Sequence, residues 1–273
     1  MGWGPALRSA RGWDAGELPL DRNAAHIEDM FSGIVARYDL MNRIMTAGMD
    51  RRWRREAARQ AAPPPGARVL DVCCGTGDLT LTLAAMWPGC HVTGLDFTEA
   101  MLVRAREKLA ARAQGGRLAP VELVRGDALA MPFADATFAA VTVSFGVRNV
   151  PDVPGVFAEM ARVTRPGGRV VSLELTETPP GLGRRFHDLW SGRVVPLLGR
   201  VVAGDARAYS YLPASVAAFP DADELAGIMA AAGLMSIRYR RYGFGAVALH
   251  VGEAPRPEAS PDGSAGATAP QGP

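Results

Sequence analysis

From Arg68 onward, hydrophobic positions follow two alternating patterns. Apolar runs of strand length occupy residues 68–72, 91–96, 121–126, 138–145 and 169–175. Between several of them, apolar residues recur with helical spacing over residues 79–87, 98–113 and 153–164. Continuous apolar strands that alternate with helices are typical of a parallel sheet covered on both faces. We therefore predict an α/β fold with a doubly wound, mostly parallel sheet.

The pattern changes after Thr178. A segment rich in Pro, Gly and Arg fills an insert at about residues 179–220, and a helix is predicted next over residues 223–233. Two further strands, 235–244 and 245–252, are separated by a tight turn at Gly243–Gly245. This ending predicts a closing antiparallel hairpin.

The length of 273 residues fits one folded domain with a large core. Residues 253–273 are rich in Pro, Gly, Ala and Ser and contain no aromatic residue, and residues 1–25 show no clear periodicity. Such segments bury too little apolar surface to offset the entropy of ordering. We predict a poorly ordered arm (1–25), a folded domain (26–252) and a disordered tail (253–273).

Composition excludes several classes of protein. A formal net charge of +2 is too small for a typical nucleic-acid-binding surface. The three cysteines, Cys73, Cys74 and Cys90, form neither a disulfide framework nor a zinc-ligand spacing, so no metal is expected. There is no apolar run of membrane-spanning length and no signal-peptide pattern. We expect a cytoplasmic protein.

A glycine-containing loop follows the first predicted strand, from Asp71 to Asp78. In open α/β sheets ligands bind beyond the carboxyl ends of the strands, and Gly75 and Gly77 allow a ligand to approach the backbone closely. Asp96 ends the next strand, about 20 residues after Gly75, where a carboxylate accepts hydrogen bonds from a ribose. The loop and Asp96 together predict an adenosine-type ligand. The alternative is that Asp96 only caps the helix that begins near residue 98.

The loop distinguishes between adenosine cofactors. An NAD site requires a third glycine, but position 80 is Thr, and Asp78 places a negative charge where a pyrophosphate would lie. S-adenosylmethionine has no phosphate and carries a cationic amino group, so Asp71 and Asp78 favour it. We predict an S-adenosylmethionine site rather than that of an NAD-dependent dehydrogenase.

Two later strand ends extend this prediction. Asp127 and Ala128 follow the third strand, where an adenine edge would lie, and Ser144 ends the fourth strand beside the same crevice. For Ser144, a strand-end serine satisfied by the backbone is an equally valid interpretation.

Three separated motifs resemble one family. They are YDLMN at residues 38–42 with Trp53 beyond it, SFGVRNV at 144–150 and RVTRPGGRVVSLE at 162–174. They resemble the signatures of the ubiquinone/menaquinone biosynthesis C-methyltransferases, which are class I S-adenosylmethionine-dependent enzymes, and the similarity runs from about residue 25 to 252. The chain departs from the family pattern at Thr46, Asp50 and the pair 164–165, and Asp50 replaces a histidine. The role that the family histidine at this position would have is therefore not expected in this chain.

The resemblance implies a fold and a set of contacts. The expected sheet has seven strands with the last hairpin antiparallel. The cofactor contacts that the resemblance implies are Thr76, Asp96, Asp127, Ala128 and Ser144.

The resemblance also implies a reaction. Family members methylate a ring carbon of a prenylated quinol and convert S-adenosylmethionine to S-adenosylhomocysteine. Val147 and the absent histidine at position 50 favour demethylmenaquinol, in the last step of menaquinone biosynthesis. The alternatives are the benzoquinol of the ubiquinone pathway, a soluble phenol, and a non-catalytic S-adenosylmethionine-binding scaffold.

The expected catalytic residues are Tyr38, Asp39, Arg148, Asn149 and His187. We expect Arg148 to bind the developing phenolate, because its permanent charge lowers the pKa of a phenol that it pairs with. Two alternatives stay open. His187 is equally well interpreted as a structural or solvated histidine, and residues 38–39 as packing at a helix end.

A prenylated acceptor resides in a bilayer, so the resemblance implies a transient peripheral contact with the inner face of the cell membrane. The insert combines Phe186, Leu189 and Trp190 with four arginines, and a second basic segment surrounds Trp53. Both fit an interfacial segment or, equally, solvated charges around an inward-packed aromatic ring. A homodimer is left open.

Overall fold

The computed structural model describes residues 4–5, 24–116, 118–179 and 214–256. Most of the arm, the insert and the tail, together with His187, therefore lies outside the described residues. Two features near these regions are described. Residues Gly4–Pro5 form a short strand, and the last strand extends to Glu253, the first residue of the expected tail.

Strands and helices alternate along most of the described chain. The strands are β1 Gly4–Pro5, β2 Arg68–Val72, β3 His91–Asp96, β4 Val121–Arg125, β5 Phe138–Ser144, β6 Thr164–Leu175, β7 Met235–Tyr242 and β8 Val247–Glu253. The α-helices are α1 Ala24–Met45, α2 Asp50–Ala61, α3 Asp78–Met86, α4 Glu99–Ala113, α5 Val153–Val163 and α9 Ala222–Ala231. Two short 3₁₀ turns are η1 Val147–Asn149 and η3 Gly243–Gly245.

The strands form one sheet in the order β1-β7-β8-β6-β5-β2-β3-β4. Strands β2 to β6 are parallel to their neighbours among themselves, whereas β8 runs antiparallel to both β6 and β7. The predicted doubly wound sheet with a closing antiparallel hairpin is thereby confirmed. The two-residue β1, which pairs antiparallel with β7, adds to the seven strands that were expected.

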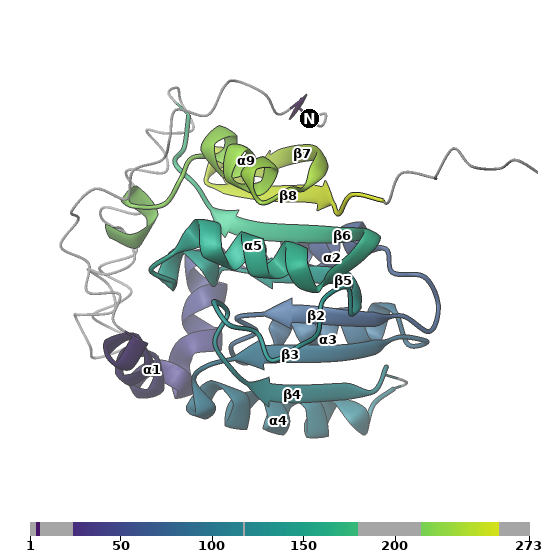
Figure 1. Ribbon diagram of the computed structural model, residues 1–273. Coiled ribbons are helices and arrows are strands. Elements are labelled where there is room, and N and C mark those ends of the chain that lie inside the picture. Colours follow the sequence, from purple (N-terminus) through teal and green to yellow (C-terminus); the bar gives the residue numbers. More distant parts are fainter. Residues whose placement is uncertain (1–3, 6–23, 117, 180–213, 257–273) are drawn as a thin grey trace, which may run out of the picture.

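Helices cover both faces of the sheet. In Figure 1, α5 and α9 lie on one face, and α2 and α3 lie on the other. Each face has its own apolar core. On one side, Phe138 of the sheet is buried with Phe157 of α5 and Met229 of α9. On the other, Trp53 of α2 and Leu83 of α3 are buried. Burying such a side chain stabilises the fold by about 1.5–3 kcal/mol. Because the central strands are covered on both faces, their sequences are mainly apolar.

Two parts of the observed fold differ from the sequence prediction. Helices α1 and α2 were not predicted. Helix α5 ends at Val163, and β6 begins at Thr164, which pairs with Phe138. The Pro-Gly-Gly turn thus falls within β6 instead of preceding it. This turn requires Gly167, whose φ is +71°.

His250 on β8 makes the stability of this fold depend on pH. Its ring is fully buried, with Nε2 2.8 Å from the carbonyl oxygen of Ala222. Burial lowers the pKa of His250 from 6.5 to about 4, so the folded protein favours the neutral ring. Below about pH 6.5 the unfolded chain takes up a proton on this ring that the folded protein does not. The free energy of unfolding therefore decreases as the pH falls from about 6.5 toward 4.

We expect His250→Gln, which keeps a donor for Ala222, to weaken that loss. Urea unfolding of both proteins near neutral pH and near pH 4.5 measures it. The free energy of unfolding should decrease more on acidification in the wild type than in the variant. Equal decreases would show that His250 does not titrate in this range.

Candidate cofactor site

A cavity of about 190 Å³ opens at the carboxyl ends of the parallel strands, beside α1. Its polar lining comes from the loops after β2, β3, β4 and β5. These lining residues include Gly75, Asp96, Thr98, Asp127 and Asn149. Ile27, Phe31 and Tyr38 of α1 close one side. The cavity lies at the sheet edge where open α/β folds bind their ligands.

Asp96 joins the first two crossover loops beneath this cavity. Its carboxylate accepts hydrogen bonds from the backbone N–H of Gly75 (2.7 Å) and of Thr98 (2.9 Å). Burial raises the pKa of Asp96, although these hydrogen bonds oppose the rise. Asp96 therefore lines the cavity, and its hydrogen bond to Thr98 holds the residue before α4 without reaching the free N–H groups of the first helical turn. Thr98 stands at the cap position, but its own side chain makes no capping hydrogen bond.

Two non-glycine residues at the cavity adopt left-handed backbone conformations. Cys73 has φ +51° after β2, and Phe145 has φ +57° after β5. Conformations of this kind cost about 1–3 kcal/mol each and cluster at functional sites. Gly146 lies between them, and a Cβ there would come within 2.4 Å of the Cβ of Cys73. No local sequence pattern signals this strain, because neither residue type favours a positive φ.

Several other predicted residues also reach the cavity. Asp127 and Ala128 line it, and the exposed Asp127 accepts a hydrogen bond from the N–H of Leu129 (2.9 Å). Asn149 lines it as well, and its buried Oδ1 has no hydrogen-bond partner among the described residues. An acceptor oxygen in this position suits a ligand that brings a donor group.

Asp71 and Asp78 flank the loop but are not among the residues that line the cavity. Asp71 is buried beneath the loop, where its carboxylate accepts hydrogen bonds from Thr80 (2.6 Å) and Thr142 (3.1 Å). Burial raises the pKa of Asp71 to about 7. Gly77 and Ser144 also lie next to the cavity without lining it. From the sequence, both acids were expected to favour the cationic S-adenosylmethionine from the lining of its site. Neither Asp71 nor Asp78 lines the cavity.

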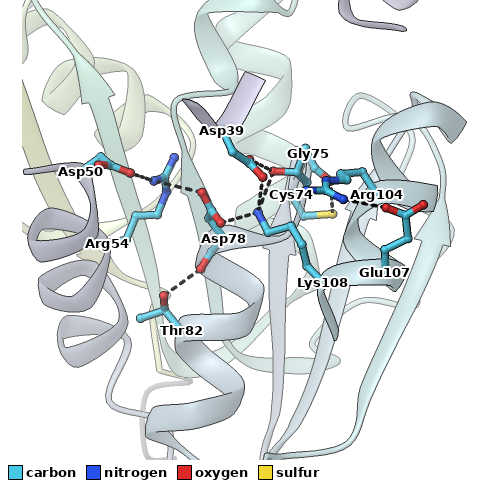
Figure 2. Close-up of polar contacts among 11 residues, drawn as sticks. Asp39, Asp50, Arg54, Cys74, Gly75, Asp78, Thr82, Arg104, Glu107 and Lys108 are labelled. Carbon is cyan, nitrogen blue, oxygen red and sulfur yellow. Dashed lines mark hydrogen bonds and ion pairs between the residues drawn. The ribbon is translucent and has the colours of Figure 1, made fainter. Parts of the chain in front are cut away.

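A set of polar contacts ties the loop to three helices (Figure 2). Lys108 of α4, the only lysine in the chain, contacts Asp39 of α1 (3.0 Å) and Asp78 at the start of α3. The hydroxyl of Thr76 donates to Asp39 (2.5 Å) and accepts from Lys108 (3.1 Å). Thr76, which belongs to the loop, and Asp39 therefore contact each other in this junction, and neither is among the residues that line the cavity.

The same contacts continue to α2 (Figure 2). Arg54 lies 3.5 Å from Asp78 and also pairs with Asp50, which accepts a further hydrogen bond from Thr46 (3.1 Å). Burial raises the pKa of Asp78, but the charges of Arg54, Lys108 and Arg43 outweigh it and hold that pKa below its usual value. Two departures from the family pattern, Thr46 and Asp50, thus contact each other.

Arg148 on η1 is buried rather than open to the cavity. Its guanidinium donates to the carbonyl of Phe145 and to Glu174 (3.2 Å). Burial raises the pKa of Glu174, and the charge of Arg148 opposes that rise. A role for Arg148 toward a phenolate stays a prediction, and the structure assigns it a structural partner.

The basic segment around Trp53 packs inward. Trp53 and Arg54 are only 6% and 5% exposed, whereas Arg51, Arg52 and Arg55 are exposed. Trp53 is therefore part of the core.

Among the residues that the structure describes, no group of His, Cys, Asp and Glu side chains is arranged to hold a metal ion.

Comparisons with known proteins identify relatives of this chain. The chain is 41% identical to a demethylmenaquinone methyltransferase of Desulfitobacterium hafniense, over 90% of this chain and 98% of the relative. It is 45% identical to the protein of that name from Thermus thermophilus (83% and 100%), and 40% identical to the ubiquinone/menaquinone biosynthesis C-methyltransferase UbiE of Paracoccus denitrificans (84% and 90%).

Solved structures support the fold. A SAM-dependent methyltransferase from Thermotoga maritima matches with a TM-score of 0.57 at 17% identity, over 84% of this chain and 100% of that one. The model of the ubiE/COQ5 methyltransferase family matches residues 20–254. The chain therefore belongs to the ubiE/COQ5 methyltransferase family.

Proposed function

We propose that this protein transfers the methyl group of S-adenosylmethionine to a ring carbon of demethylmenaquinol. The supporting observation is the cavity at the carboxyl ends of β2 to β5, lined by Gly75, Asp96, Asp127 and Asn149, in a member of this family. Relatives named for demethylmenaquinone, at 41–45% identity, favour this acceptor over the benzoquinol.

The residues in the cavity fit S-adenosylmethionine. Asp96 offers carboxylate oxygens to the ribose hydroxyls, and Asp127 with Ala128 faces the adenine. The unpartnered Oδ1 of Asn149 is an acceptor for a donor group of either reactant. When bound, the cofactor supplies an electrophilic methyl group on a positively charged sulfur.

The protein has to hold the acceptor carbon in line with that methyl group and accept the proton that the ring loses. The methyl group would pass from sulfur to the ring carbon, so that the carbon–sulfur bond breaks as the carbon–carbon bond forms, with S-adenosylhomocysteine and a proton as the other products. Pre-organisation of the two reactants supplies several kcal/mol of the barrier. Tyr38 lines the cavity and has a phenolic group for contact with the quinol, while the apolar Ile27 and Phe31 exclude water.

The acceptor's prenyl tail requires contact with a bilayer surface, which we include in the proposal. Within the described part of the chain, no helix has the length and apolar character needed to cross a membrane. We propose a transient, peripheral contact.

Methyl transfer to reduced substrates tests the proposal. Purified protein with S-adenosylmethionine labelled in the methyl group should methylate prenylated demethylmenaquinol faster than prenylated benzoquinol, and both faster than the ring without its tail. In parallel, deletion of the gene should cause demethylmenaquinone to accumulate in the host, as measured by mass spectrometry. Transfer only to soluble phenols, or cofactor binding without any transfer, would contradict the proposal.

A further inference from the structure

A second cavity, of about 510 Å³, lies between the helices of the α2–α3 face and shares no lining residue with the cofactor cavity. We call it the arginine recess. Five arginines and one acid line it, together with the outer side of α3. These charged residues are Arg43, Arg51, Arg54, Arg55, Arg112 and Asp78.

The recess carries uncompensated positive charge. Arg43, Arg51, Arg55 and Arg112 are exposed, and none of the four has an ion pair within the described ranges. Asp78 is already shared between Lys108 and Arg54, as Figure 2 shows. The charge of Arg43 also acts on Asp78, but one carboxylate already shared by Lys108 and Arg54 cannot balance four exposed guanidinium groups.

Arg54 supplies an independent observation. Its side chain is almost fully buried, pairs with Asp50 and lies 5.2 Å above the ring of Phe145, so its position is fixed. Its Nε has no hydrogen-bond partner among the described residues. A buried donor without an acceptor costs about 1–3 kcal/mol, and Arg54 lines the recess with this donor unpaired.

We propose that the arginine recess binds phosphate groups, supplied either by a soluble polyphosphate compound or by anionic phospholipid headgroups. Guanidinium groups match phosphate oxygens in bidentate geometry, and several converging on one cavity favour a multiply charged ligand. The side of α3 in the recess includes Leu81, Ala85 and Met86, which gives the organic part of such a ligand an apolar surface. Binding here requires neither methyl transfer nor its acceptor.

The test uses the full chain and two probes. Calorimetry measures the affinity for inorganic pyrophosphate, and sedimentation measures binding to vesicles of phosphatidylglycerol and phosphatidylcholine. The variant Arg51→Gln/Arg55→Gln removes two exposed charges from the recess. The control Arg165→Gln/Arg256→Gln removes the same charge from exposed positions outside it.

We expect the recess variant to bind at least one probe about tenfold more weakly than the wild type, and the control to stay within about twofold. Loss confined to pyrophosphate identifies a soluble ligand, and loss confined to vesicles identifies a lipid headgroup. The affinity for S-adenosylmethionine, measured on the same samples, reports an intact fold and separates this result from any failure of methyl transfer. Absence of binding to both probes, or equal losses in the two variants, would overturn the proposal.

Discussion

Replacing Asp96 by Ala is expected to raise the dissociation constant for S-adenosylmethionine at least about a hundredfold. In the proposed complex the carboxylate accepts two hydrogen bonds from the ribose, which would contribute about 1.5–3 kcal/mol each and would both be lost. The variant also removes the acceptor that joins the N–H groups of Gly75 and Thr98, so the two loops lose their common support. Calorimetric titration of the cofactor measures the effect.

Asp127→Asn is the matched control, because it removes the same charge from the same cavity at an exposed position. We expect this variant to weaken cofactor binding less than about tenfold. If Asp96→Ala kept the wild-type affinity with an unchanged thermal transition, Asp96 would not contact the cofactor.

Replacing Arg148 by Ala is expected to destabilise the protein by about 3–5 kcal/mol. The substitution leaves Glu174, which is 1% exposed, without its ion-pair partner, and stranding a buried charge has a cost of this size. Urea unfolding measures the loss. This expectation follows from the structure, whereas the sequence predicted a larger effect on turnover than on cofactor binding.

The double variant Arg148→Met/Glu174→Gln separates stability from catalysis. Its neutral Gln keeps an oxygen for the N–H of Val147, which donates to Glu174 at 2.9 Å, so most of the lost stability should return. A stable double variant that binds the cofactor but transfers no methyl group would support a role for Arg148 in the reaction. A stable and active one would show that this arginine acts only through the fold.

The sheet was predictable because its strands are buried on both faces. Each run of residues at 68–72, 91–96 and 138–144 has an apolar centre and is buried over nearly its whole length, and each is followed by a loop and a helix. Helix α2 was missed because its buried face consists largely of alanines such as Ala57, Ala58 and Ala61 among many arginines. The helical spacing of those alanines was a signal that could have revealed it.

The cavity was partly predictable. Gly75, Asp96 and Asp127 follow from strand ends and their spacing, since parallel strands place their carboxyl ends along one edge. The directions of Asp71 and Asp78 were not predictable, because they depend on partners far away in sequence. Asp78 contacts Lys108, 30 residues distant. Contacts of this range are set by helix packing, and local patterns do not encode them.

The junction around Lys108 has a practical consequence. Because the chain contains a single lysine, reagents that acylate primary amines have one side-chain target, besides the amino terminus. That target lies where α1, α3 and α4 meet behind the glycine loop, with 17% of its side chain exposed. A fluorophore or cross-linker coupled through this amine would report on one internal position of the enzyme, whereas most proteins would be labelled all over their surface.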